Sequence, residues 1–491
     1  MPFKNRKSNV DYGSKSEYLK VTRMGAHAIN RRYTVQEALN PKNVAVVGAS
    51  SNPTKVGNSV LKSLTSNPDL KVYPVNPKLR EVEGLKVYPS LSAIPSRVDL
   101  TVIAVPRDKV ISAVKESVSK RTKGIVIISS GFREADDQAG PLLQSELTKI
   151  CTETGVRIFG PNIFGFVNVV SNVNASFTPM FSSLKKGHVA VVSQSGGICH
   201  YLMHNYIDDL GFSYIIHVGN RCDVDFPEVL SFLKDDVHTR VITLYVEGVD
   251  DARELYQAIS ETAKAKPVIA LKAGKSAIAD KASKSHTGSL SGNYQLYRCA
   301  MKQAGAVVVD SPVELLDLAK ALTLFRKVKS GGVAILAIQA GLGFMALDII
   351  EEGGGVIAKF KPETLEVLHE LLPPITMRDN PIDIAFSGLN IDVMESVLEA
   401  IAKDESVGLI LFAYAAAPPT WTIPPEAISG IFGRIEKPVM VVYSSTMEDF
   451  RKFKAEMEHL GVPTYSSLER AAKIAAIISK HSRQLSAYRL G

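Results

Sequence analysis

The sequence predicts an α/β protein of three consecutive doubly wound units, each a parallel sheet with helices on both faces. The first observation is a similar apolar opening that recurs at residues 44–47, 189–192 and 333–336 (VAVV, VAVV and VAIL). The second is that each opening runs into a Gly- or Ser-containing turn and then a helix-like pattern. Fully apolar strands that alternate with helices indicate parallel sheets covered on both faces. Further strands of this kind are expected at residues 100–105, 125–128, 240–246, 267–271 and 407–413.

The domain boundaries follow from composition and turn signals. The polar stretch 327–332 is typical of a linker. Ser-x-x-Glu patterns that begin at Ser311 and Ser466 each predict a capping box, and thus a helix start, near the end of the second and third units. The expected division is a basic tail over residues 1–37 and domains over residues 38–160, 161–328 and 329–491.

Composition excludes several classes of protein. With 491 residues, 45% of them apolar and 22% charged, the chain is long enough for about three globular domains of roughly 150 residues. Its apolar stretches have strand length rather than the roughly 20 residues of a membrane span, so no membrane association is expected. The four cysteines stand far apart without a CxxC pair, which predicts neither a disulfide framework nor a zinc site. A reducing cytoplasm is the expected location.

The net charge of +7 does not indicate nucleic-acid binding. The first 33 residues contain eight Lys and Arg but only two acidic residues, so they carry most of the excess, and the rest of the chain is close to neutral. Such a basic arm is typical of a solvated tail. No nucleic-acid partner is expected.

The turn after the first strand is a candidate phosphate site. Residues 48–57 (GASSNPTKVG) open a helix, so backbone N–H groups and the helix dipole can face an anion. A dinucleotide dehydrogenase would have G-x-G-x-x-G here and an acid after the second strand, and this chain has neither. The second strand ends instead in Asn76, Pro77 and Lys78. A lysine there suits a ligand with an additional phosphate, although an isolated lysine at this position is more typical of a surface turn.

Several spaced motifs together resemble one family. In the first unit these are residues 128–132 (ISSGF) and 160–162 (GPN), and in the second residues 193–197 (SQSGG), 219–220 (GN), 223–225 (DVD) and 245–248 (YVEG). The most specific are residues 272–275 (KAGK) and 285–292 (SHTGSLSG). In this order they resemble the alpha chains of succinyl-CoA synthetase and the NDP-forming acyl-CoA synthetases. The resemblance implies a Rossmann-like domain that binds coenzyme A, followed by two flavodoxin-like domains of the succinyl-CoA synthetase type.

The third unit resembles the ligase-CoA domain of this family through residues 380–383 (NPID) and its terminal helix. Its first turn, residues 340–343 (AGLG), departs from the Asn-Ala-Gly-Gly form of these synthetases. It is closer to the carboxy-terminal domain of succinyl-CoA synthetase beta chains. Ile163 also replaces a cysteine that often follows the Gly-Pro-Asn motif of the family.

The resemblance assigns roles to named residues. His286 is the expected phosphate carrier, since histidine is a nitrogen nucleophile that is neutral near pH 7. Glu247, at the end of a buried strand, is the candidate that orients it, although without the resemblance this acid would be read as part of a helix start. Asn162 is the expected substrate contact, and no metal site is expected. The predicted coenzyme A-binding residues are Gly48, Ala49, Ser50, Ser51, Lys55, Gly57, Asn76, Pro77, Lys78, Ser129 and Ser130.

Two helix starts are candidates for holding the transferred phosphoryl group, because a helix N-terminus supplies fixed positive potential. One lies in each of the last two units, and either could also be no more than a tight turn. The residues are Ser195, Gly196 and Gly197 in the second unit and Gly341, Leu342 and Gly343 in the third.

The expected reaction is acyl-CoA + ADP + phosphate ⇌ carboxylate + CoA + ATP, with acetate or another small carboxylic acid. No Walker-type motif occurs, and the three units leave no residues for an ATP-grasp domain. The resemblance therefore implies an ATP-grasp beta subunit that carries Mg-ADP or Mg-ATP, in an α2β2 complex. A catalytically silent CoA-binding sensor or scaffold is the alternative, and the intact 285–292 motif argues against it.

Overall fold

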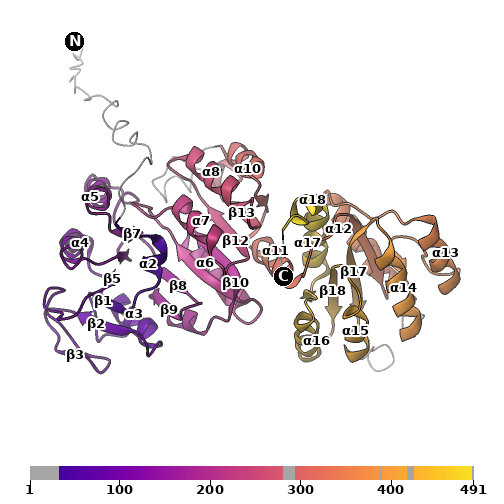
Figure 1. The fold of residues 1–491 in the computed structure, drawn as a ribbon, viewed down its shortest axis with the longest axis horizontal. Coiled ribbons are helices and arrows are strands. Elements are labelled where there is room, and N and C mark those ends of the chain that lie inside the picture. The colour runs from indigo at the N-terminus through magenta and orange to yellow at the C-terminus, as the bar shows by residue number, and fades with distance from the viewer. Residues whose placement is uncertain (1–31, 280–292, 386–389, 417–424, 489–491) are drawn as a thin grey trace, which may run out of the picture.

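The protein is described by a computed structural model over residues 32–279, 293–385, 390–416 and 425–488. Three sheets follow one another along an elongated molecule, in chain order (Figure 1). Their strands span residues 43–159, 165–308 and 332–465. The predicted α/β fold with doubly wound parallel sheets is confirmed.

In the first unit, all neighbouring strands of the order β2-β1-β5-β6-β7 are parallel. β5 and β6 are buried along their whole length, as expected for strands covered on both faces. The strands are β1 (Asn43–Val47), β2 (Lys71–Val75), β5 (Leu100–Ile103), β6 (Gly124–Ile127) and β7 (Arg157–Phe159), with an inserted ribbon of β3 (Glu81–Val82) and β4 (Leu85–Lys86). The helices are α2 (Val35–Leu39), α3 (Val56–Thr65), the 3-10 turn η1 (Arg107–Lys109), α4 (Val110–Ser119) and α5 (Ala139–Thr154).

The second sheet has the order β14-β13-β12-β10-β11-β8-β9. Its strands are β8 (Gly165–Asn168), β9 (Val173–Ser176), β10 (Lys186–Ser193), β11 (Phe212–His217), β12 (Val241–Val246), β13 (Val268–Lys272) and β14 (Val307–Val308). Its helices are η2 (Pro179–Ser183), α6 (Gly196–Tyr206), α7 (Phe226–Asp235), α8 (Ala252–Thr262), α10 (Tyr294–Gln303) and α11 (Pro312–Leu324).

The third sheet has the order β16-β15-β17-β18-β19. Its strands are β15 (Gly332–Ala337), β16 (Ile382–Asp383), β17 (Val407–Ala415), β18 (Val439–Ser444) and β19 (Thr464–Tyr465). Its helices are α12 (Ala340–Glu352), α13 (Pro362–Leu371), α14 (Ile391–Lys403), α15 (Pro425–Phe432), α16 (Met447–His459), α17 (Leu468–Lys480) and α18 (Ser482–Leu485).

All three sheets share one topology. With the inserted ribbon β3–β4 and the hairpin β8–β9 set aside, each runs in the order second, first, third, fourth, fifth strand. The order reverses between the first and third strands, which are β1 and β5, β10 and β12, or β15 and β17. Open parallel sheets bind ligands outside the carboxyl ends of the strands at such a switch point. The fold thus offers three equivalent places for a site.

The antiparallel hairpin β8–β9 was not expected from the sequence. β8 pairs antiparallel with β11 and β9, and so extends the second sheet. The strands contain Asn168, Asn174 and Ser176, which are buried and hydrogen-bonded rather than apolar. A periodicity argument misses such strands, because their buried side chains are polar and are satisfied by hydrogen bonds, to Leu39 in the case of Asn168 and within the hairpin and the turn after it for Asn174 and Ser176.

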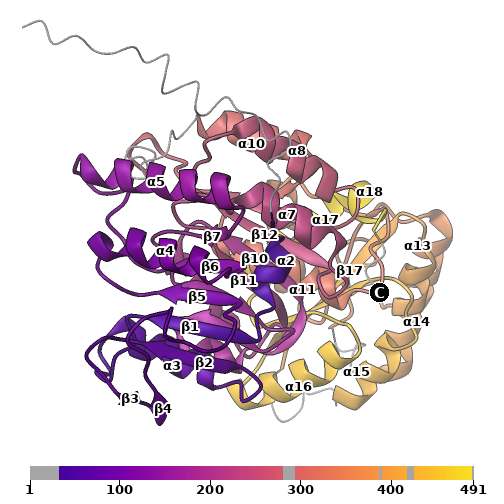
Figure 2. The same ribbon diagram turned by 60° about the vertical axis from the view of Figure 1, so that its left-hand side comes forward.

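The hydrophobic cores cross both unit boundaries. One core joins Val60 and Leu61 of α3 to Phe166 and Ala175 of the β8–β9 hairpin. A second joins α11 of the second unit to α17 of the third, and the two helices lie side by side in Figures 1 and 2. There Asp317 of α11 binds Arg470 of α17, with Nη2 to Oδ1 at 2.6 Å. The three units therefore pack as one body rather than as separate domains on flexible linkers.

One predicted capping box is wrong and the other is only half present. Ser311 caps α11 by accepting from the N–H of Glu314, but the Glu314 carboxylate accepts from Asp310 N–H instead of closing the box. In the third unit Ser467, not Ser466, is the N-cap of α17. The third residue after this cap is Arg470, so Glu469 cannot close a capping box, and it pairs instead with Lys473 one turn further along the helix.

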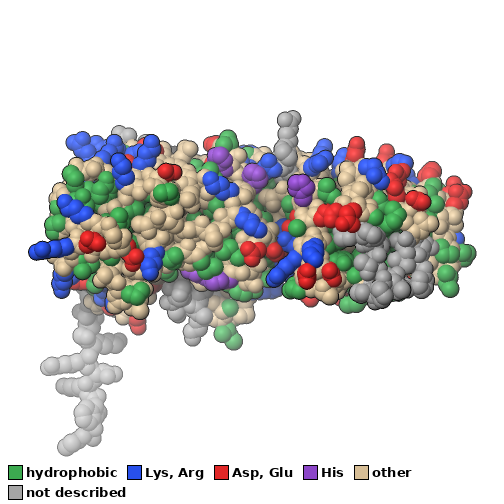
Figure 3. Space-filling view, turned by 90° about the horizontal axis from the view of Figure 1, so that it is seen from below, with side chains coloured by type: hydrophobic (Ala, Val, Ile, Leu, Met, Phe, Trp, Pro, Cys, Tyr) green, Lys and Arg blue, Asp and Glu red, His purple; other side chains and the backbone are tan. Residues whose placement is uncertain are grey.

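Charges are mixed along the face of the molecule drawn in Figure 3, where basic and acidic side chains alternate with apolar ones. The basic residues at positions 4–31 of the tail lie outside the described residues. None of the helices in the described part of the chain combines the length and the apolar character that a membrane crossing requires.

Candidate active site

The first switch point carries a cavity of about 900 Å³. It is open between the turn that follows β1, the turn that follows β2 and the turn that follows β5. Cavities of this size hold cofactor-sized ligands. Eight of the predicted coenzyme A residues line it: Gly48, Ala49, Ser50, Lys55, Gly57, Asn76, Pro77 and Lys78.

The two glycines at this cavity are required by close backbone approach. Gly48 has φ of +94°, and a Cβ on it would lie 2.3 Å from the carbonyl oxygen of Ala104. A Cβ on Gly57 would lie 2.0 Å from the carbonyl oxygen of Gly48. The turn after β1 is therefore pressed between the turn after β5 and the first turn of α3. This packing aims the N-terminus of α3, which no side chain caps, at the cavity.

Three lysines border the cavity, namely Lys55, Lys78 and Lys109. None of the three forms an ion pair with an acid within the described residues. Asn76 shapes the turn that carries Lys78, since its side chain donates to Ala49 O (2.8 Å) and accepts from Lys78 N–H (2.8 Å). Sequence reasoning missed Lys109, although it follows β5 at the switch point, where the topology rule would have found it.

Three predicted coenzyme A residues do not line the cavity. Ser51 and Ser130 are exposed outside it. Ser129 reaches its edge, because its hydroxyl donates to the carbonyl oxygen of Val105, which does line the cavity. The loop after β6 thus touches this site from the side that faces the second unit.

At the second switch point, Gln194 holds the end of β12. Its side-chain oxygen accepts from the N–H groups of Glu247 (2.9 Å) and Gly248 (3.1 Å). The next residue, Ser195, is the N-cap of α6 and accepts from Ile198 N–H at 3.4 Å. Gln194 therefore brings Glu247 to the N-terminus of α6, where Gly196 and Gly197 form the first turn. The sequence analysis included Gln194 in the 193–197 motif but predicted no role for its side chain.

Glu247 lies in a buried and charged setting. Only 8% of the residue is exposed. Burial, and then the negative charge of Glu247, raise the pKa of Tyr245 to about 12. The buried Lys272 donates to the carbonyl oxygen of Glu247 (2.8 Å) and lies over the ring of Tyr297. A carboxylate can orient and stabilise a cationic imidazole, and a helix N-terminus can stabilise a phosphoryl group.

The first turn of α6 rests on a buried histidine. A Cβ on Gly196 would lie 3.0 Å from Cε1 of His217. His217 accepts from Phe164 N–H at Nδ1 (3.0 Å) and donates from Nε2 to Gln194 O (3.1 Å), which fixes the neutral tautomer. Burial lowers its pKa to about 4. His217 is thus a neutral support for the turn.

Asn162 lies between the first two units. It has φ of +60°, its N–H donates to Ser129 O at 3.0 Å, and its side chain donates to Asn220 Oδ1 at 3.5 Å. Asp223 and Asp225 of the 223–225 motif are structural. Asp223 binds Arg157 of β7 at 2.9 Å, and Asp225 closes a capping box at the start of α7.

At the third switch point, Gln339 repeats the part of Gln194. Its side chain donates to Ala415 O (2.8 Å) and accepts from Ala415 N–H (3.1 Å) at the end of β17. Gln339 is also the N-cap of α12, and it makes no capping hydrogen bond. Gly341 and Leu342 lie in the first turn, and a Cβ on Gly341 would meet no atom within 4 Å. Gly343, in contrast, packs against Pro381.

His286 and the rest of residues 280–292 lie outside the described residues. The nearest strand before this segment is β13, which ends at Lys272 beside Glu247, and the helix after it is α10, which begins after Asn293. Within the described ranges, no group of three or more His, Cys, Asp or Glu side chains is arranged to hold a metal ion.

Comparison with known proteins identifies the family. Residues 42–168 match the model of a CoA binding domain, and residues 186–322 match a succinyl-CoA ligase like flavodoxin domain. The chain is 36% identical over 452 residues to the alpha subunit of acetate–CoA ligase (ADP-forming) II of Pyrococcus furiosus, covering 91% of this chain and 97% of the relative. The chain belongs to the ADP-forming acyl-CoA ligase family. It is accordingly an acid–thiol ligase subunit of the alpha type.

Other members of the family extend this result. An acetate–CoA ligase (ADP-forming) I of Archaeoglobus fulgidus is 36% identical, and the matched part is 90% of this chain but 63% of that longer relative. A solved structure of the dinucleotide forming acetyl-coenzyme A synthetase 1 of Ca. Korarchaeum cryptofilum, in complex with phosphate and ADP, superposes with a TM-score of 0.82 at 32% identity, over 92% of this chain and 97% of that one. The alpha-subunit name of the Pyrococcus relative implies a beta subunit in that enzyme.

Proposed function

We propose that this alpha-type subunit binds coenzyme A in the cavity of the first unit and carries the phosphoryl group on His286. The observation that supports this most is the pairing of two switch points. The first holds a cavity with three lysines free of acidic partners in the described chain, and the second holds Glu247 at the N-terminus of α6. The first site suits a polyanionic ligand, and the second suits phosphoryl transfer.

The proposed chemistry proceeds in two steps on this chain. Phosphate attacks the thioester carbonyl of acyl-CoA, and the thiolate of coenzyme A leaves, which yields an acyl phosphate. A ring nitrogen of His286 then attacks phosphorus, and the carboxylate leaves. Glu247 orients the imidazole and stabilises its positive charge. Ser195, Gly196, Gly197 and the first turn of α12, with Gly341, Leu342 and Gly343, supply N–H groups to the phosphoryl oxygens.

The remaining steps need a partner. We propose an ATP-grasp beta subunit that binds Mg-ADP and takes the phosphoryl group from His286, in an α2β2 complex. A small carboxylic acid near Asn162 is the proposed acyl substrate. The described cysteines, Cys151, Cys199, Cys222 and Cys299, are free thiols, which suits a reducing cytoplasm.

The phosphate carrier is tested with the purified chain and labelled phosphate. With acyl-CoA present, the wild-type chain is expected to take an acid-labile, base-stable label, and His286→Ala is expected to take none. Addition of ADP alone should yield no ATP until the beta subunit is supplied. Coenzyme A binding without any label would instead indicate a silent CoA-binding protein.

The coenzyme A site is tested by calorimetry. Lys78→Ala is expected to weaken binding of coenzyme A, and the effect should shrink with dephospho-CoA and at high salt, where charges are screened. Lys62→Ala on the far part of α3 is the matched control, since Lys62 does not line the cavity. Equal affinities of Lys78→Ala and the wild type for coenzyme A would mean that Lys78 is only a residue of a surface turn and does not contact the ligand.

A further inference from the structure

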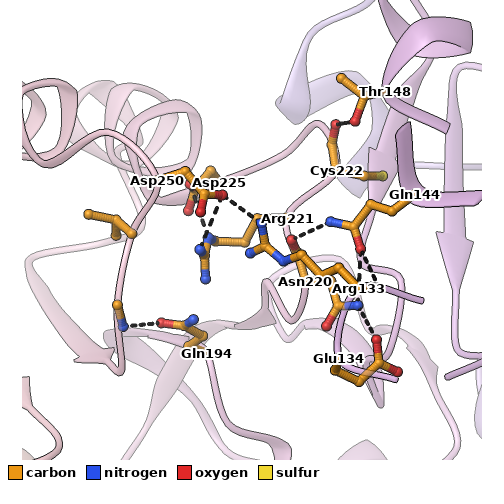
Figure 4. A network of polar contacts seen from close by, with 12 residues as sticks. Arg133, Glu134, Gln144, Thr148, Gln194, Asn220, Arg221, Cys222, Asp225 and Asp250 are labelled. Carbon is orange, nitrogen blue, oxygen red and sulfur yellow. Dashed lines mark hydrogen bonds and ion pairs between the residues drawn. The ribbon is translucent and has the colours of Figure 1, made fainter. Parts of the chain in front are cut away.

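The turn that follows β12 is held at each of its four residues. Gln194 accepts from the N–H groups of Glu247 and Gly248. The hydroxyl of Tyr297, from α10, accepts from Val249 N–H at 3.2 Å. Asp250 is bound by two arginines (Figure 4). The position of Glu247 therefore depends on four different segments, and the loop with Arg133 is the one that comes from the first unit.

Arg221 is the buried member of the arginine pair. Its side chain is fully buried, and it binds Asp225 Oδ2 at 3.1 Å and Asp250 Oδ2 at 3.4 Å. Removing a partner from a buried guanidinium is costly, because the charge is left without compensation. Burial raises the pKa of Asp250, but the charges of Arg133 and Arg221 outweigh it and hold that pKa below its usual value. Asp250 is thus an anion at neutral pH.

Arg133 comes from the first unit. Its Nη1 lies 2.7 Å from Asp250 Oδ2, and its side chain is 16% exposed. It belongs to the loop after β6, which also carries Ser129 at the edge of the coenzyme A cavity. Glu134 stiffens this loop by accepting from Gly131 N–H (2.6 Å), Phe132 N–H (3.0 Å) and Asn220 Nδ2 (2.5 Å). A change at Ser129 can therefore reach Arg133 through a short, braced segment.

We propose that Arg133 is a positioning residue that couples the coenzyme A site to Glu247 through its ion pair with Asp250. The inference rests on the proposed function for the role of Glu247. Coenzyme A in the first unit steadies the loop after β6, Arg133 holds Asp250, and the turn keeps Glu247 in place for the phosphoryl step. The coupling is reciprocal, so occupancy of the phosphoryl site also favours coenzyme A. This contact lets the chain respond at one site to the ligand at the other.

The first experiment measures rates of His286 labelling in the full-length chain. Arg133→Ala and Asp250→Asn are each expected to slow labelling at saturating acyl-CoA by about tenfold to a hundredfold, the effect of misplacing a reacting group. The double variant should be no slower than the slower single variant, because both act through one ion pair. Asp250→Glu should recover part of the rate. Additive losses, or rates equal to wild type, would overturn the proposal.

The matched control is Asp251→Asn in the same turn. Asp251 caps α8 by accepting from the N–H groups of Arg253 and Glu254, both at 2.9 Å, and binds no arginine among the described residues. Since asparagine is an equally good N-cap, labelling should stay at the wild-type rate. A loss equal to that of Asp250→Asn would mean that the turn responds to any change, and Asp250 would then have no special role.

The second experiment needs no phosphorylation and so separates the two proposals. Hydrogen exchange of the backbone over residues 245–251 is compared with and without coenzyme A. Coenzyme A is expected to slow exchange several-fold in the wild type and to leave it unchanged in Arg133→Ala. No effect of coenzyme A on the wild type overturns the coupling even if His286 is labelled. A normal effect together with an unlabelled His286 would refute the proposed function and retain the coupling.

Discussion

The second and third units have the same strand order, the same helix after the first strand and a glutamine at the same turn, yet they differ at the residue that this glutamine binds. Gln194 holds Glu247, and Gln339 holds Ala415. α6 starts with a serine cap over the buried His217, while the first turn of α12 has no side-chain cap and packs on Pro381. The shared scaffold places a strand end beside a helix start. The side chain at that strand end decides which chemistry is possible there.

The largest expected effect tests this difference directly. Glu247→Gln keeps the shape and the backbone contacts with Gln194 but removes the negative charge. Labelling of His286 should slow about a hundredfold, as for the loss of one electrostatic partner in an active site, with unchanged affinity for coenzyme A. Rapid-quench labelling measures the rate. Glu261→Gln, an exposed acid on α8, is the control, and an equal rate for Glu247→Gln and this control would remove Glu247 from the mechanism.

The two glutamines should differ in their contribution to stability. Gln194→Ala leaves the buried N–H groups of Glu247 and Gly248 without an acceptor, which should cost about 3 kcal/mol of unfolding free energy. Gln339→Ala leaves the backbone N–H and C=O of the half-buried Ala415 to water, and it should cost about 1 kcal/mol of unfolding free energy. Urea unfolding at neutral pH compares the two. Equal losses would mean that the turns are equivalent supports.

His217 should make the second unit sensitive to acid. Burial lowers its pKa from 6.5 to about 4, so the unfolded chain binds a proton that the folded chain excludes. Stability is therefore complete above pH 6.5 and falls as the pH drops toward 4, by up to about 1.4 kcal/mol per pH unit. The loss between pH 7 and pH 5 should be smaller in His217→Asn than in the wild type. Identical losses would show that His217 takes up its proton without opening the fold.

The smallest expected effects come from glycines at the two helix starts. Neither Gly197 nor Gly341 has a close neighbour at its Cβ position, and neither has a positive φ. Alanine at either should leave the fold intact and stabilise its helix by up to about 1 kcal/mol. If both helix starts hold the phosphoryl group, each added methyl group should slow His286 labelling several-fold. If only Gly197→Ala slows labelling, the turn at Gly341 has a structural role and does not hold the phosphoryl group.

Much of the candidate site followed from local pattern. The turn at Gly48 and the residues Asn76 to Lys78 each follow an apolar strand, so strand ends and turns could be placed, and topology brought eight of these residues to one cavity. Ser51 and Ser130 were predicted because they lie within the motifs at residues 48–57 and 128–132, but both are exposed outside the cavity. Lys109 was not predicted because it lies in no motif, and only the strand order brings the turn after β5 next to the turn after β1.

The sequence by itself determined the number of units, the parallel sheets and the turn and helix that follow the first strand of each unit, because an apolar strand followed by a small-residue turn is specified within about ten residues. Tertiary structure decided which polar groups meet. Gln194 with Glu247, Arg133 with Asp250 and Arg157 with Asp223 are each separated by dozens of residues, and no local periodicity encodes such pairs. It also decided the polar hairpin β8–β9 and the N-cap of α17. The physical reason is that a buried polar side chain needs a hydrogen-bond or ion-pair partner, and for these three pairs that partner is fixed only once the sheets have packed.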